Sequence, residues 1–348
     1  MQKQNGYDDS RMYFTSAPRD FVTVLVDGRC LCWNATFRAY KYYPDATGTE
    51  REATIINALL DKIEHVSRVF NTTRLIFAWD CSKDTSLRRK LYPDYKNNRA
   101  GWNPDKPLPN TNLPDYKRSQ MEKNLLVRVE CEYFWKTIEN EVVTGLGFPS
   151  YKFDGYEGDD IIASIIKNNP HRKFIIYSDD NDYIQLVNDD VALAWVRDSS
   201  KAGNIPLYTR YRLQQGDALR GLPPWRWADV KALAGCRSDA VPGIRGIGSD
   251  TAVEYLLNDG HLYTKTGKTS LKQYKIEQAI KSGEVDLWDK LVRLPFEGTP
   301  QIKMPVFDKS KNNEYRSYFI RLCDQYGIIQ KQGSEFWDEF YAEENENE

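Results

Sequence analysis

Asp154-Gly-Tyr-Glu-Gly-Asp-Asp160 and Lys173-Phe-Ile-Ile-Tyr-Ser-Asp-Asp-Asn-Asp182 flank the apolar run 161–166. This stretch has the length of one helix and one buried strand, as in the αβ unit of a parallel sheet. It places two acidic clusters at the ends of neighbouring elements. Because like charges repel, such clusters are costly unless a cation neutralises them. A helix dipole also favours acids in its first turn, which would explain Glu157 alone, but the whole set favours a cation site.

Three more apolar runs have strand length, at residues 21–26, 75–79 and 191–196. The first ends at Asp27 and the second at Asp80, while an amphipathic helix is predicted over 51–70. Alternating strands and helices predict an α/β fold with a central, mostly parallel sheet and helices on both faces. Since the carboxyl ends of parallel strands share one edge, the acids that follow these strands should converge there.

The composition is that of a globular protein, with 348 residues, 41% hydrophobic and 28% charged. A formal net charge of −2 means that a polyanionic partner would need locally clustered cations. The sequence has no apolar run that could span a bilayer and no apolar leader, so we expect a cytoplasmic protein. Its 6 cysteines include no Cys-x-x-Cys pair, which disfavours a zinc site.

The chain is expected to divide into four parts: a flexible leader at 1–20, an α/β core at 21–200, a mostly helical region at 201–340 and an acidic tail at 341–348. Within the core, the Pro-rich stretch 102–114 predicts an exposed mobile loop, and the basic character continues to residue 128.

The acids are hard oxygen ligands, the type that suits Mg²⁺ or Mn²⁺. They are Asp27, Asp80, Glu157, Asp159, Asp160, Asp180 and Asp182. Two such ions about 4 Å apart can activate water and stabilise the leaving oxygen in phosphodiester cleavage. Each acid alone has a structural explanation, but the set points to a metal site.

Residues 86–99 interleave cations with aromatic side chains, a pattern typical of nucleic-acid surfaces, where charge meets phosphate and rings meet bases. Composition alone slightly favours a solvated charged face. The position of the stretch, just after Asp80, favours the nucleic-acid interpretation.

The loop 241–250 carries Gly243, Gly246 and Gly248 between two predicted helices. Glycines at this spacing permit a tight turn whose backbone N–H groups can cradle an anion. A dinucleotide fingerprint is disfavoured, because the glycine order differs and a helix precedes the loop in place of a strand. An ordinary interhelical turn is the alternative.

Together these stretches resemble the structure-specific 5′-nuclease family, which includes flap endonucleases, the 5′-nuclease domain of DNA polymerase I and bacteriophage 5′-exonucleases. The resemblance covers residues 21–257. It rests on Leu-Tyr-Pro-x-Tyr-Lys-x-x-Arg at 91–99, Glu-x-Asp-Asp at 157–160, Asp-x-Asp-x-x-Gln-Leu at 180–186 and Ala-Leu-x-Gly-x-x-Ser-Asp-x-x-Pro-Gly-x-x-Gly-Ile-Gly at 232–248. It implies a PIN-like fold, a helical arch within 83–128 and a helix-hairpin-helix motif at 228–257.

The resemblance also implies roles for individual residues. The first metal site would comprise Asp27, Asp80, Glu157, Asp159 and Asp160, and the second Asp180, Asp182 and Asp239. The expected catalytic residues are Lys96, Arg99 and Asp160. Nucleic-acid contacts are expected from Arg88, Tyr95, Lys96, Arg99, Gly243, Arg245, Gly246 and Gly248. Two Mg²⁺ ions, replaceable by Mn²⁺, and a K⁺ ion at the helix-hairpin-helix motif are implied as well.

One departure concerns the second metal site. The family usually has Gly-Asp-x-x-Asp-Asn where this chain has Gly-Cys-Arg-Ser-Asp-Ala at 235–240. A thiol is a poor Mg²⁺ ligand, so the second ion is predicted to be held weakly through the loss of a carboxylate at Cys236. Asp179 would compensate only if it faced the same way as Asp180, and neighbours on an extended segment point to opposite faces.

The expected function is that of a metal-dependent 5′ nuclease, a 5′ to 3′ exonuclease and flap endonuclease acting on branched or nicked DNA in replication and repair. One alternative is an RNase H-like 5′-exonuclease that removes RNA primers from RNA/DNA hybrids. Another, which Cys236 favours, is a weakened relative that mainly binds branched DNA. A monomer is expected, and the compact motif set without a polymerase domain leans towards a phage-type enzyme in the host cytoplasm.

Overall fold

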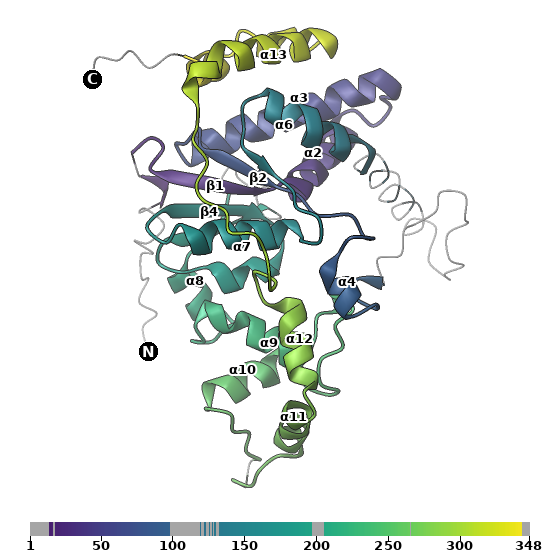
Figure 1. Cartoon of the computed structure of the whole chain (residues 1–348), viewed down its shortest axis with the longest axis vertical. Coiled ribbons are helices and arrows are strands. Elements are labelled where there is room, and N and C mark those ends of the chain that lie inside the picture. The colour runs from purple at the N-terminus through teal and green to yellow at the C-terminus, as the bar shows by residue number, and fades with distance from the viewer. Residues whose placement is uncertain are drawn as a thin grey trace.

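A six-stranded sheet forms the centre of the protein, with the strand order β3-β2-β1-β4-β5-β6 (Figure 1). The computed structural model describes residues 14–16, 18–97, 119, 122, 125, 127, 129, 132–196, 205–264 and 266–342. The strands are β1 (Val22–Asp27), β2 (Leu75–Ala78), β3 (Ser150–Tyr151), β4 (Lys173–Ser178), β5 (Val191–Trp195) and β6 (Leu207–Tyr208). All neighbouring pairs are parallel except β5 and β6, which confirms the predicted α/β class.

The helices within the described residues follow in chain order. They are α2 (Gly28–Tyr42), α3 (Gly48–Val69), α4 (Leu87–Leu91), α6 (Val143–Gly145), α7 (Gly158–Asn168), α8 (Arg210–Gln215), α9 (Trp227–Ala234), α10 (Ser249–Leu257), α11 (Leu271–Lys281), α12 (Glu284–Val292), α13 (Asn312–Gln325) and α14 (Glu335–Phe340). In this part of the chain no helix is long and apolar enough to cross a bilayer.

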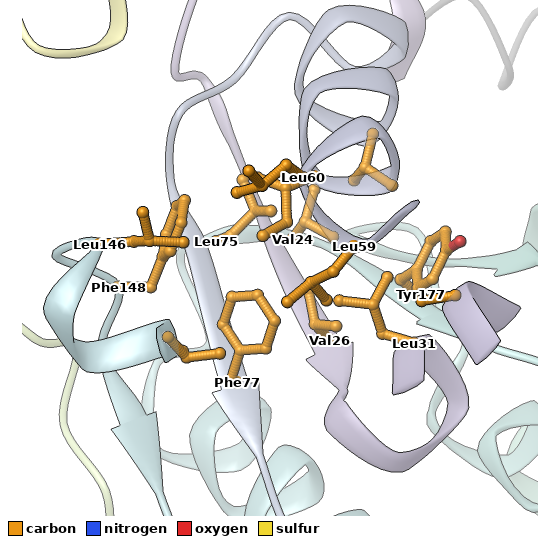
Figure 2. Close-up of a cluster of buried hydrophobic side chains, with 14 of the residues drawn as sticks. Val24, Val26, Leu31, Leu59, Leu60, Leu75, Phe77, Leu146, Phe148 and Tyr177 are labelled. Carbon is orange, nitrogen blue, oxygen red and sulfur yellow. The ribbon is translucent and has the colours of Figure 1, made fainter. Parts of the chain in front are cut away.

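The sheet is buried on both faces, as parallel sheets require. Side chains alternate along β1: Val24 and Val26 pack beneath α2 and α3, while Leu25 points to the opposite core beside α7. Figure 2 shows Val24 and Val26 against Leu59 and Leu60 of α3. This arrangement fixes the carboxyl ends of β1, β2 and β4 along one edge of the sheet.

Helices α8–α12 lie on the α7 side of the sheet and extend away from it (Figure 1). The glycine-rich loop joins α9 to α10, so the two helices predicted around it are confirmed. A Cβ atom at Gly243 would lie 2.2 Å from the Gly235 backbone nitrogen, and both glycines have positive φ angles, 63° and 82°. This close approach of two backbone segments requires glycine.

The region predicted as one helical unit, 201–340, is divided in the structure. Helices α13 and α14 lie on the far side of the sheet from α9–α12 (Figure 1). Their side chains Phe319 and Trp337 are buried in the core beneath α3. The aromatic residues of this segment are buried by packing against the sheet, so the helices of the expected helical region lie on both sides of it.

Of the expected leader, 1–20, the structure describes residues 14–16 and 18–20, and Phe14 is buried in the same core. The acidic tail from 343 and most of the predicted arch, 98–118, lie outside the described residues.

Candidate active site

A cavity of about 140 Å³ lies at the sheet edge where β1, β2 and β4 end. Its lining includes the carboxylates of Asp27, Asp80, Asp159, Asp179 and Asp180. Arg29, Cys30, Trp33, Lys96 and Tyr183 complete the wall. The predicted convergence of strand-end acids is therefore present, although Asp179 was expected to point away. The chain turns into a 3-10 segment right after Asp180, so the alternation of an extended strand no longer applies.

Backbone geometry holds two of these acids in place. Asp27 ends β1 and caps α2, accepting hydrogen bonds from the Cys30 amide (3.0 Å) and the Ser178 hydroxyl (2.9 Å). Asp80 accepts a hydrogen bond from the Gly158 amide (2.8 Å) at the start of α7. Each strand end thus passes its acid to the first turn of a helix, where the dipole favours negative charge.

The cavity is crowded with negative charge. Burial, with the charges of Asp80 and Asp180, raises the pKa of Asp27 to about 7. Burial and the charge of Asp160 raise the pKa of Asp159 well above its ordinary value. The buried Asp159 Oδ1 atom has no hydrogen-bond partner among the described residues. Orphaned buried oxygens are rare, and convergent carboxylates suit a hard divalent ion, so these residues fit a metal site.

The metal-free protein is expected to lose stability as pH rises from about 4 to about 7. The folded state binds a proton at Asp27 up to its pKa of about 7, whereas the unfolded state releases it near 3.8, so folding is favoured at low pH and this gain is lost as pH rises. Urea unfolding in EDTA at about pH 5 and about pH 8 would measure the difference. Asp27→Asn or saturating Mn²⁺ should reduce this change in unfolding free energy with pH. An equal change in wild type and Asp27→Asn would contradict a raised pKa at Asp27.

A second cluster lies beside the cavity. Ligand atoms of the buried residues Asp182, Cys236 and Asp239 lie within 4.8 Å of one another. The Lys231 ammonium forms an ion pair with Asp182, and the Cys236 thiol donates to Asp239 Oδ2 (3.4 Å). Asp180, predicted to join this set, faces the cavity instead, because the 3-10 turn that it caps separates it from Asp182.

Arg88 and Asp160 form a buried ion pair beside the cavity. Arg88, predicted as a nucleic-acid contact, is only 2% exposed in this structure. Its guanidinium pairs with both carboxylate oxygens of Asp160, and its Nε donates to the Leu291 carbonyl (2.9 Å). Asp160 also accepts from the amides of Glu157 (3.0 Å) and Phe296 (2.7 Å). With its oxygens engaged in these hydrogen bonds, Asp160 lies outside the cavity wall, and its catalytic role stays a prediction.

Glu157 and Tyr95 belong to the same buried network. The Tyr95 hydroxyl donates to Glu157 Oε2 (2.9 Å), and Tyr95, predicted as a nucleic-acid contact, is only 2% exposed in this structure. Lys96 Nζ lies 2.8 Å from the same oxygen. Burial alone would raise the pKa of Glu157, but Lys96 and Arg88 hold it down at about 2. Glu157 thus fixes the position of Lys96.

A second, smaller hollow of about 50 Å³ adjoins the acidic cavity and is rich in cations. Arg29, Lys83, Arg89 and Lys96 line it, together with Asp80, Cys81, Ser82, Ser86 and Glu157. Arg29, Asp80 and Lys96 line both hollows, so an anion in one would lie next to a cation in the other. Of these cations Arg89 and Lys96 lie in the predicted stretch 86–99, whereas Arg29 and Lys83 were not predicted; Arg99 lies outside the described residues.

The glycine-rich loop presents backbone to solvent, with Arg245, Gly246 and Gly248 exposed and Gly243 half-buried. Gly248 caps α10. Helix α11 runs beside the loop: Lys275 Nζ donates to the Arg245 carbonyl (3.4 Å) and Lys272 Nζ to the Thr251 hydroxyl (3.0 Å). Lys272 and Lys275 of α11 therefore lie against the predicted anion cradle.

Comparison with known proteins agrees with this geometry. The family described as "5′-3′ exonuclease, N-terminal resolvase-like domain" matches residues 22–211. The chain is 27% identical over 276 residues to the 5′-3′ exonuclease of Bacillus subtilis (strain 168), covering 75% of this chain and 80% of that protein. It is 26% identical over 298 residues to DNA polymerase I of Mycobacterium tuberculosis (strain ATCC 25618 / H37Rv), covering 82% of this chain and 29% of the polymerase. The chain thus spans less than a third of that polymerase.

Solved structures share the fold. Bacteriophage T5 5′-exonuclease with bound divalent zinc ions superposes with a TM-score of 0.56 at 17% identity, covering 92% of this chain and 99% of the other. T5 flap endonuclease in a pseudo-enzyme-product complex with DNA and metal ions gives 0.56 at 17% identity, covering 91% and 99%. Flap endonuclease-1 from Methanococcus jannaschii superposes with a TM-score of 0.50 at 16% identity, covering 92% of this chain and 92% of the other. Because the matched residues 22–211 carry the sheet and the acids of the cavity, the chain belongs to the 5′-3′ exonuclease family.

Proposed function

We propose that the chain is a divalent-metal-dependent 5′ nuclease, a 5′ to 3′ exonuclease and flap endonuclease that hydrolyses phosphodiester bonds in branched or nicked DNA during replication. The observation that carries this proposal is the pair of adjoining hollows, one acidic and one cationic, which share Arg29, Asp80 and Lys96. Such a pair can hold a cation and a phosphate side by side.

Asp27, Asp80, Asp159, Asp179 and Asp180 would hold the metal, with Mg²⁺ proposed and Mn²⁺ as its substitute because the ligands are oxygens. A bound divalent ion would supply an activated water and stabilise negative charge on the phosphate. Arg29 and Lys96 would orient the phosphate at the boundary of the two hollows, and Glu157 would keep the Lys96 ammonium there.

The duplex part of the substrate would lie along the glycine-rich loop and α11. The exposed backbone at Gly246 and Gly248, with Arg245, Lys272 and Lys275, offers donors and charge to phosphates. A K⁺ ion at this loop, which the family resemblance implies, action as a monomer and a cytoplasmic location are further parts of the proposal.

The test is a substrate panel. Labelled 5′-flap DNA, nicked DNA and an RNA-primed duplex are incubated with the full chain in Mg²⁺ or in EDTA. Short products from the flap and nicked DNA in Mg²⁺ alone are the expected result. Cleavage confined to the RNA-primed duplex would favour the RNase H-like alternative. Tight binding of flap DNA without product in Mg²⁺ or Mn²⁺ would overturn the nuclease proposal in favour of a branched-DNA-binding protein.

A further inference from the structure

The cluster of Asp182, Cys236 and Asp239 is built differently from the cavity beside it. All three residues are less than 10% exposed, at 6%, 7% and 4%. Their positions are fixed by the short 3-10 segments Asn181–Leu186 and Arg237–Asp239 and by the bridge between Cys236 and Val241. The cluster therefore has the compactness of an ion site, and its occupant depends on its charge and donor types.

The charge of the cluster is compensated from within the protein. Asp182 is ion-paired with Lys231, a residue of α9 that is itself only 6% exposed. Asp239 lies 4.0 Å from the Lys96 ammonium through its Oδ1 atom and accepts the Cys236 thiol proton through Oδ2. The neutral Cys236 thiol contributes a soft sulfur donor and no negative charge, so it is a poor ligand for a hard divalent ion such as Mg²⁺. A divalent ion here would have to approach a buried ammonium at short range, where the repulsion is strong.

We propose that the Lys231 ammonium is the resident cation of this cluster, so that in the absence of nucleic acid the cavity carboxylates alone hold a hard divalent ion tightly. This deepens the proposed function and rests on it for the identity of the cavity as the metal site. In this proposal the Lys231 ammonium neutralises the charge of the cluster and repels a second divalent ion, which would otherwise bind there tightly.

Binding of Mn²⁺ to the full chain, counted by electron paramagnetic resonance of the free ion, tests this directly. Wild type is expected to bind one Mn²⁺ tightly and any further ion at least about tenfold more weakly. Lys231→Met and Cys236→Asp should each tighten the weaker site by about tenfold or more, because each raises the net negative charge of the cluster. Lys331→Met is the matched control, since it also removes an ammonium held between two acids, Asp61 and Glu64, far from the site.

Thermal unfolding provides a second readout. Lys231→Met should melt at a lower temperature than wild type in EDTA, because Asp182 is left as an unpaired buried charge. Mn²⁺ should raise its melting temperature by more than it raises that of wild type. Wild type binding two Mn²⁺ ions with equal affinity, or folded variants with unchanged Mn²⁺ binding, would overturn the inference. The number of Mn²⁺ ions that wild type binds tightly tests the inference even where a variant does not fold.

The two proposals fail in different ways. Two equal Mn²⁺ sites in wild type would sink the inference about Lys231 even if flap DNA is cut. A protein that cleaves none of the substrates of the panel would contradict the proposed function, whatever number of Mn²⁺ ions it binds.

Discussion

Arg88→Met is expected to lower the free energy of unfolding by roughly 3–5 kcal/mol, because it leaves Asp160 as an unpaired charge in the core. Asp160 is fully buried, at 0% exposure, and the Arg88 guanidinium binds both of its oxygens. The substitution also removes the hydrogen bond from Arg88 Nε to the Leu291 carbonyl, which ties α4 to α12. Urea unfolding of the metal-free protein, followed by circular dichroism, gives the change in free energy.

Two variants sharpen this experiment. The double variant Arg88→Met with Asp160→Asn should recover part of the loss, because the remaining side chain no longer carries a charge. Lys90→Met, an exposed neighbour on the same short helix, should change stability by no more than about 0.5 kcal/mol. Equal stability of Arg88→Met and Lys90→Met would show that the buried ion pair does not hold α4 in place.

The sequence predicted the sheet edge well because strands and their following acids are local signals. An apolar run that stops at Asp27 or Asp80 marks both the end of a strand and the side chain presented there. Helix α2 was missed for a local reason too: its buried side chains include small residues such as Cys30, Ala35 and Ala39, which give a weak apolar stripe. Strands β3 and β6 have two residues each and carry no periodic pattern.

Which acids face the cavity and which pair with a buried cation could not be predicted from local signals. Asp159 and Asp160 are adjacent in the first turn of α7, and consecutive helical residues point about 100° apart. Asp159 faces the cavity, whereas Asp160 faces Arg88, which is 72 positions away in the sequence. Lys231 gives no signal either, since a lysine in a predicted helix usually faces water and its burial depends on how α9 packs.

Asp159→Asn is expected to slow metal-dependent cleavage by about a thousandfold, which corresponds to about 4 kcal/mol of lost charge stabilisation in the transition state. The Asp159 carboxylate lines the cavity, and its Oδ1 atom is buried without a partner among the described residues. Asparagine keeps the shape of the side chain but offers a divalent ion no charge. Single-turnover cleavage of flap DNA at saturating Mn²⁺ measures the loss, and Asp154→Asn, an exposed acid of the same stretch, serves as the control.

The same substitution should raise the stability of the metal-free protein. Burial and the charge of Asp160 raise the pKa of Asp159, so its ionised form destabilises the fold when no metal is bound. Asp159→Asn removes that penalty, and its melting temperature in EDTA should therefore exceed that of wild type, while Mn²⁺ should stabilise it less. An unchanged cleavage rate, or a lower melting temperature in EDTA, would contradict a metal-ligand role. The sign of the stability change separates the two kinds of buried charge: breaking the Arg88 ion pair leaves a charge without compensation, whereas neutralising Asp159 removes a charge that only a metal would compensate.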